Sequence, residues 1–137
     1  ERWMSFDNET TIVNGKNTKC REIDKLENSV MATTSSHEFG MEKWRAYQSL
    51  EASVKVTTTG SDCYNYGLLA NGYLDIVAEK LTAPHDYLPL IKIVQGAGGI
   101  MTDWEGNNLN FSDKNVYVLA SSSNRLHELA LEKLRAE

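Results

Sequence analysis

The spacing of apolar residues changes along the chain between the two-residue period of a strand and the longer period of a helix. Residues 54–58 alternate in period two, whereas Tyr66, Leu69 and Ala70 share one face of a helix expected over residues 62–71. By the same criteria, further strands are expected at residues 29–34, 74–78, 100–103 and 116–120. Further helices are expected at residues 38–50, between Asp86 and Gly98, and from about Ser123.

Strands that alternate with helices predict an α/β fold, with a layered, mixed β-sheet and helices packed on it. An Asn14-Gly15 pair near the start adds a β-hairpin, because both residues accept positive φ angles. The 137 residues are 41% hydrophobic and 24% charged, which is typical of a globular protein with a single core. We therefore expect one domain over residues 1–137.

Charge and cysteine content exclude several classes of function. The formal net charge is −5 and Lys and Arg form no cluster, which argues against nucleic acid or an anionic membrane surface as a partner. No apolar run approaches the roughly 18 residues that a membrane span requires. Cys20 and Cys63 lie far apart without a C-x-x-C partner, so we expect two ordinary thiols and a reducing, cytoplasmic location.

Three carboxylates lie where expected strands and helices meet, which is where α/β proteins gather ligand-binding groups: Asp62, Glu79 and Asp86. A structural explanation exists for each. An Asp at a helix N-terminus accepts hydrogen bonds from unpaired backbone N–H groups, and a Glu at a strand end is usually solvated. Alternatively, Asp86 is a hard oxygen ligand suited to Mg²⁺, stiffened by Pro84 and Pro89 on either side. Spacing alone leaves both interpretations open.

Longer motifs add a resemblance to a known family. Residues 60–72, followed by Asp75, resemble the G-x-D-C-Y-x-Y-x-x-x-A-x-G motif of histidinol-phosphate phosphatases. Residues 84–99 and 102–106 resemble the Asp-containing helix, A-G-G turn and T-D-W-x-G strand of the wider inositol monophosphatase-like family of Mg²⁺-dependent phosphatases. The resemblance covers nearly the whole chain and implies that fold and phosphomonoester hydrolysis.

The resemblance also implies roles for particular residues. Asp86 would be the catalytic metal ligand for Mg²⁺, and Gly60, Ser61, Asp62 and Glu79 would line the pocket for a small phosphorylated substrate. Related inositol phosphatases tend to have a small residue at the position of Asp62, and a carboxylate there would pair with an ammonium group. This favours histidinol phosphate, and hence histidine biosynthesis, over the alternative of inositol phosphate.

Two features depart from the family pattern. His85 stands where the family usually has Trp or Tyr, and the upstream D-x-x-D-G-T metal motif is absent from these residues. The sequence, which starts at Glu1, therefore resembles only the C-terminal half of the family, and we expect it to be inactive without the N-terminal half. A non-catalytic assembly or binding module is the alternative. A surface that the other half would cover also predicts homo-oligomerisation.

Overall fold

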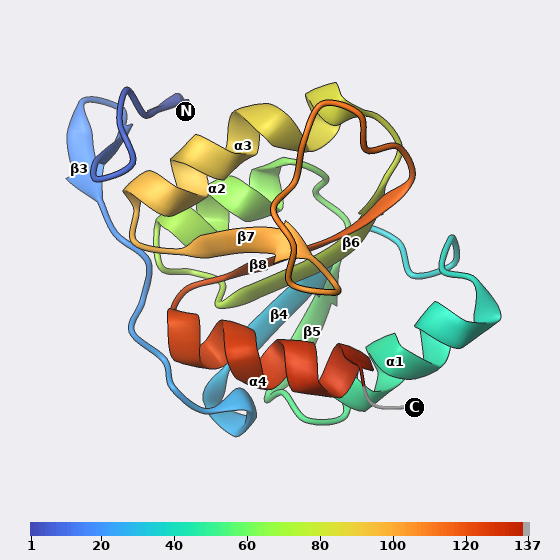
Figure 1. Ribbon diagram of the computed structural model, residues 1–137. Coiled ribbons are helices and arrows are strands. Elements are labelled where there is room, and N and C mark those ends of the chain that lie inside the picture. The colour runs from blue at the N-terminus through green and yellow to red at the C-terminus, as the bar shows by residue number, and fades with distance from the viewer. Residues whose placement is uncertain (136–137) are drawn as a thin grey trace.

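A five-stranded mixed sheet forms the centre of the molecule, as the sequence pattern predicts (Figure 1). The computed structural model describes residues 1–135. The spatial order of the sheet is β5-β4-β6-β8-β7. Its strands are β4 (Val30–Thr33), β5 (Val56–Thr59), β6 (Ile76–Leu81), β7 (Ile100–Asp103) and β8 (Val116–Ser121). Strand β4 is parallel to β5 and β6, whereas β8 is antiparallel to β6 and β7.

Helices cover both faces of this sheet (Figure 1). Helices α1 (Met41–Glu51) and α4 (Asn124–Arg135) pack on one face, and α2 (Tyr64–Ala70) and α3 (Pro84–Gly96) pack on the other. Side chains of a strand alternate between the two faces, so β6 contributes to both cores. Ile76 and Ala78 contact the α1–α4 side and Val77 contacts the α2–α3 side, which places the next odd residue, Glu79, beneath α2 and α3.

A small antiparallel sheet forms a further layer against α3. It consists of β1 (Trp3–Met4), β2 (Thr11–Val13) and β3 (Lys16–Thr18), and a short 3-10 helix, η1 (Leu26–Asn28), follows it. Asn14 and Gly15 form the predicted hairpin turn, with φ angles of 49° and 83°. The Thr11 hydroxyl donates a hydrogen bond to the Ile93 carbonyl at 2.7 Å, which joins this sheet to α3.

Several predicted boundaries move by a few residues, and two of these shifts affect the carboxylates. Strand β6 extends to Leu81 instead of ending at residue 78, because it pairs with β8 over its whole length. Glu79 is therefore a buried strand residue and not a solvated strand end. Helix α2 begins at Tyr64 with Cys63 as its N-cap, so Asp62 lies in the preceding turn and provides no side-chain cap.

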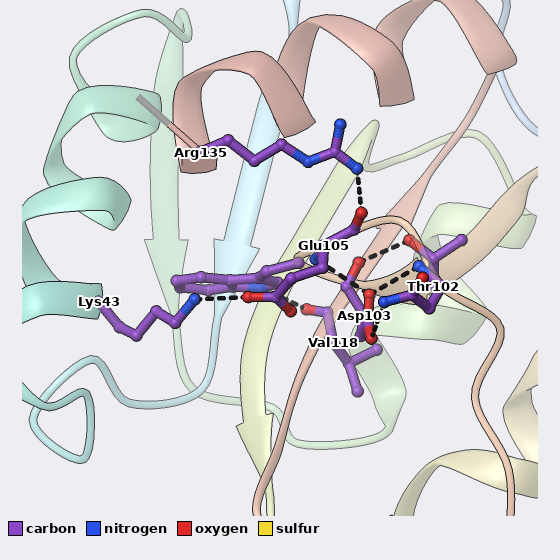
Figure 2. A network of polar contacts seen from close by, with 8 residues as sticks. Lys43, Thr102, Asp103, Glu105, Val118 and Arg135 are labelled. Carbon is purple, nitrogen blue, oxygen red and sulfur yellow. Dashed lines mark hydrogen bonds and ion pairs between the residues drawn. The ribbon is translucent and has the colours of Figure 1, made fainter. Parts of the chain in front are cut away.

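The turn between β7 and β8, residues 103–107, is held by a network of polar contacts (Figure 2). The Asp103 carboxylate accepts hydrogen bonds from the backbone N–H groups of Glu105 and Asn107, at 2.9 and 2.7 Å. Lys43 of α1 forms an ion pair with Glu105 at 2.7 Å, and Arg135 of α4 donates to the Glu105 carbonyl. The turn thus joins α1 and α4 through contacts with Glu105.

The path of the chain creates a crevice at the carboxyl end of β4. From β4 the chain crosses through α1 to β5, and from β5 it crosses the opposite face through α2 to β6, on the other side of β4. The loops that leave β4 and β5 consequently diverge toward opposite faces. Open α/β sheets bind ligands at such a point of reversal.

Within residues 1–135, none of the helices has the length and apolar character that crossing a membrane would require.

Candidate active site

A cavity of about 550 Å³ opens at this crevice and collects side chains from four segments of the chain. Thr34 follows β4, Asp62 precedes α2, Glu79 lies in β6 and Asp86 lies in the first turn of α3. The three carboxylates that the sequence singles out therefore line one cavity. Their location in one cavity means that a single ligand could contact all three.

The loop that carries Asp62 has an unusual backbone. Gly60, Ser61 and Asp62 have φ angles of 92°, 79° and 44° in succession. Positive φ is costly for residues with a side chain, on the order of 1–3 kcal/mol each, and is often retained at functional sites. Here the Gly60 N–H donates to the Thr33 carbonyl at 3.1 Å, and the Asn65 amide donates to the Gly60 carbonyl at 2.8 Å. These contacts hold the loop so that Asp62 reaches the cavity.

Glu79 is the most enclosed of the three carboxylates, with 2% of its surface exposed. One carboxylate oxygen accepts hydrogen bonds from the Thr34 N–H, at 2.9 Å, and from the Thr34 hydroxyl. The other oxygen accepts from the Tyr66 hydroxyl at 2.9 Å. Burial raises the pKa of Glu79, the three hydrogen bonds oppose this shift, and the negative charge of Asp62 adds to it.

Asp86 accepts a hydrogen bond that caps α3, and it also lines the cavity. Its Oδ2 accepts a hydrogen bond from the Ala83 N–H at 3.0 Å, so it closes the N-terminus of α3 as the structural explanation predicts. Its Oδ1 lies 3.5 Å from Nε2 of His85, whose side chain is 84% exposed. The Asp86 side chain is itself 39% exposed, so capping and ligand binding are compatible.

The donor chemistry fits one part of a Mg²⁺ site. Mg²⁺ prefers carboxylate oxygens and keeps several water ligands, and Asp86 offers such an oxygen at the cavity surface. Within residues 1–135, however, no group of three or more His, Cys, Asp or Glu side chains is arranged to hold a metal ion. Residues 1–135 therefore provide no complete metal-coordination shell of this kind.

The cavity carboxylates lack a permanent counter-ion. Among residues 1–135, neither Asp62 nor Glu79 forms an ion pair with Lys, Arg or His, and Asp86 has only the contact with His85. Lys80 borders the cavity, but its Nζ lies 3.4 Å from the Glu38 carbonyl and 6.0 Å from the centre of the Tyr117 ring. The site thus has a surplus of negative charge.

The sequence-based selection of site residues is partly matched by this geometry. Gly60 and Ser61 are not among the described residues that line the cavity, because their backbone groups form the turn that carries Asp62. Thr34 and Tyr66 line it and were missed. Tyr66 lies four residues after Asp62 in the motif, one helical turn away, which was a usable signal. Thr34 is 45 residues before Glu79, and only the pairing of β4 with β6 brings them together.

Comparison with known proteins establishes the family. The sequence profile of the inositol monophosphatase family matches residues 1–137. The chain therefore belongs to this family of phosphatases.

Individual relatives agree with this assignment. The chain is 36% identical over 140 residues to the bifunctional phosphatase IMPL2, chloroplastic, of Arabidopsis thaliana, in a match covering 98% of this chain and 40% of that protein. An inositol monophosphatase structure from Zymomonas mobilis has 35% identity and a TM-score of 0.94, covering 99% of this chain and 53% of that one. The extragenic suppressor protein suhB of Bartonella henselae, at 23% identity, shares the fold with a TM-score of 0.81, covering 92% of this chain and 48% of that one. The chain thus spans about half or less of the length of these relatives.

Proposed function

We propose that this chain forms the substrate-selecting part of a Mg²⁺-dependent phosphomonoesterase whose substrate is a phosphorylated amino alcohol such as histidinol phosphate. The observation that carries the proposal is that Asp62, Glu79 and Asp86 line one cavity. Glu38 also lines it, and none of these four residues forms an ion pair with Lys or Arg within residues 1–135. Such a site favours cations, namely a metal ion and an ammonium group.

Each carboxylate has a distinct task in this proposal. Asp86 contributes an oxygen ligand for Mg²⁺, and Asp62 and Glu79 accept hydrogen bonds from the substrate's ammonium group. When bound, Mg²⁺ supplies charge neutralisation at the phosphate and a more acidic water. The rigid loop at residues 60–62 and the buried position of Glu79 hold the two selecting carboxylates in place before the substrate arrives.

The remaining metal ligands are proposed to come from residues outside this sequence. Support comes from Asp86, which lines the cavity without two further His, Cys, Asp or Glu side chains placed to share a metal within residues 1–135, and from the matches, which extend over 40% of IMPL2 and 53% of the Zymomonas chain. For the same reason we expect residues 1–137 alone to bind Mg²⁺ weakly and to turn over no substrate. Self-association also stays a prediction; the edge strand β5, where Val56 is 47% exposed, is one surface available for it.

Inositol phosphate is the second candidate substrate, because the Zymomonas relative with the high structural similarity is an inositol monophosphatase. An inositol ring is neutral, so its binding gains no charge–charge attraction from Asp62 and Glu79. Substrate preference therefore discriminates the two candidates.

The decisive experiment measures kcat/KM of the complete protein, with Mg²⁺, for histidinol phosphate and for inositol monophosphate. We expect a clear preference for histidinol phosphate, and we expect Asp62→Asn to raise the KM for that substrate about tenfold, since a charge-assisted hydrogen bond is lost. Glu105→Gln, outside the cavity, is the matched control and should leave the KM for both substrates unchanged. A preference for inositol phosphate contradicts the substrate assignment, and inactivity on both supports a non-catalytic module.

A further inference from the structure

Three donors from two different segments of the chain hold the Glu79 carboxylate. The Thr34 N–H and hydroxyl bind one oxygen, and the Tyr66 hydroxyl binds the other at 2.9 Å. A carboxylate offers about four acceptor positions, so three donors leave room for roughly one further hydrogen bond. The oxygen that binds the Tyr66 hydroxyl has only this one donor, and Glu79 is one of the residues that line the cavity.

The donors are themselves rigid. Tyr66 is fully buried in α2, packed in the core that includes Leu69 and Val77, and burial together with the nearby Glu79 charge raises the pKa of Tyr66 well above its usual value. Its hydroxyl therefore stays protonated and donates. Thr34 immediately follows β4, whose pairing with β6 fixes its backbone beside Glu79. Two separate elements thus determine the orientation of one carboxylate.

Burial of an unpaired carboxylate normally causes it to take up a proton. The hydrogen bonds from Thr34 and Tyr66 oppose this by stabilising the charged form. A core that needed no charge at this position would be served by an apolar residue of similar volume. The arrangement places a carboxylate with hydrogen bonds that favour its charged form in the wall of a ligand-sized cavity.

We infer that Tyr66 and Thr34 are positioning residues that hold Glu79 as an oriented, ionised acceptor for the ammonium group of the substrate. This inference rests on the proposed function and adds to it the residues that determine the preference for a cationic substrate. It also assigns the two tyrosines of the motif different tasks. Tyr66 acts through Glu79, whereas Tyr64 is 42% exposed and lies against Trp3 with ring centres 5.5 Å apart.

The test compares variants of the complete protein on both substrates. Tyr66→Phe and Thr34→Val each remove one hydroxyl donor to Glu79 with little change of volume, and Thr34→Ser retains the donor. Tyr47→Phe is the matched control, because Tyr47 is also buried and its hydroxyl lies 3.3 Å from a glutamate, Glu51, in α1 outside the cavity. Circular dichroism and urea unfolding verify that each variant is folded.

We expect Tyr66→Phe and Thr34→Val to raise the KM for histidinol phosphate about tenfold, with kcat changed by less than about threefold. The KM for inositol phosphate should stay within about twofold of the wild type. Thr34→Ser and Tyr47→Phe should resemble the wild type on both substrates. This pattern is specific to positioning, because a general loss of structure would affect both substrates alike.

The wild-type protein separates the two ways in which the result can fail. In the first case, the wild type prefers the cationic substrate, but Tyr66→Phe leaves the KM for histidinol phosphate unchanged or raises the KM for both substrates equally. The positioning role is then overturned and the proposed function survives. If the wild type shows no preference for the cationic substrate, the proposed function fails at its substrate assignment, and the inference that depends on it fails as well.

Discussion

Two groups of carboxylates, one in the β7–β8 turn and one at the cavity, have different surroundings. In the β7–β8 turn, Asp103 accepts hydrogen bonds from its own turn, including one from the Asn107 side chain at 3.1 Å, and Glu105 is paired with Lys43. In the cavity, Asp62 and Glu79 have no cationic partner within residues 1–135.

The difference separates residues that build the fold from residues that are available to a ligand. Asp62 in the cavity and Asp103 in the turn both belong to the motifs on which the family resemblance rests, so membership of a motif does not reveal the task. Asp103 accepts backbone hydrogen bonds that close a turn, and these hydrogen bonds are exposed to solvent. Glu79 is buried and oriented without a counter-ion, which costs stability unless a positive ligand binds. Among these carboxylates, Glu79 combines burial with the lack of a cationic partner within residues 1–135, and this combination motivates its proposed role.

The largest expected effect comes from Asp86. If Asp86 is the proposed Mg²⁺ ligand, Asp86→Asn in the complete protein should lower kcat for histidinol phosphate by roughly a hundredfold or more, because the negative charge is lost while the shape is retained. Steady-state kinetics at saturating Mg²⁺ measures this. The thermal unfolding midpoint should stay close to wild type, since the Asn oxygen can still accept from the Ala83 N–H. An Asn variant with full activity would remove Asp86 from the metal site.

The second effect concerns His127, a buried residue of α4. Thr102 donates to the Asp103 carbonyl, so His127 Nε2–H donates to Thr102 and Nδ1 accepts from the Ser121 hydroxyl. Burial, with a smaller effect of the Arg135 charge, lowers the pKa of His127 from 6.5 to about 4. The folded protein therefore keeps this histidine neutral where the unfolded chain protonates it.

This linkage has a definite sign. As pH falls from about 6.5 to about 4, unfolding takes up a proton at His127, so the free energy of unfolding decreases, by up to about 3 kcal/mol. Urea unfolding at several pH values, compared with His127→Gln, measures the histidine's share of the slope. Parallel curves for the two proteins over this range would show that His127 titrates normally in the folded state.

The smallest effect is expected from the ion pair at the turn. Lys43→Met removes the contact with Glu105 and the cation–π contact with Tyr117, whose ring centre lies 5.7 Å from Nζ. Because the Glu105 side chain is 55% exposed, solvent screens the pair, and the loss of stability should be below about 1 kcal/mol. Urea unfolding measures it, and the KM values for both substrates should be unchanged. A marked change in substrate preference would contradict the conclusion that the turn and the cavity act independently.

The local pattern of the sequence was sufficient for most of the fold. Alternating and helical apolar spacings correctly predict the mixed α/β sheet, and Asn14-Gly15 and Gly98 predict a hairpin turn and a helix end, with Gly98 at a φ angle of 91°. Boundaries were less accurate where pairing decides them, as for β6, which continues through Glu79 because β8 lies beside it.

The position of Asp62 and Asp86 near the junctions of elements was determined by the sequence alone, because helix and strand periods act over a few neighbouring residues. Only the tertiary structure decided which of these side chains meet and what surrounds them. The pairing of Ala32 with Val77 brings Thr34 to Glu79, α2 turns Tyr66 inward, and the Lys80 side chain extends toward Tyr117. Such contacts join residues far apart in the chain, and the balance of charge in the cavity depends on all of them together.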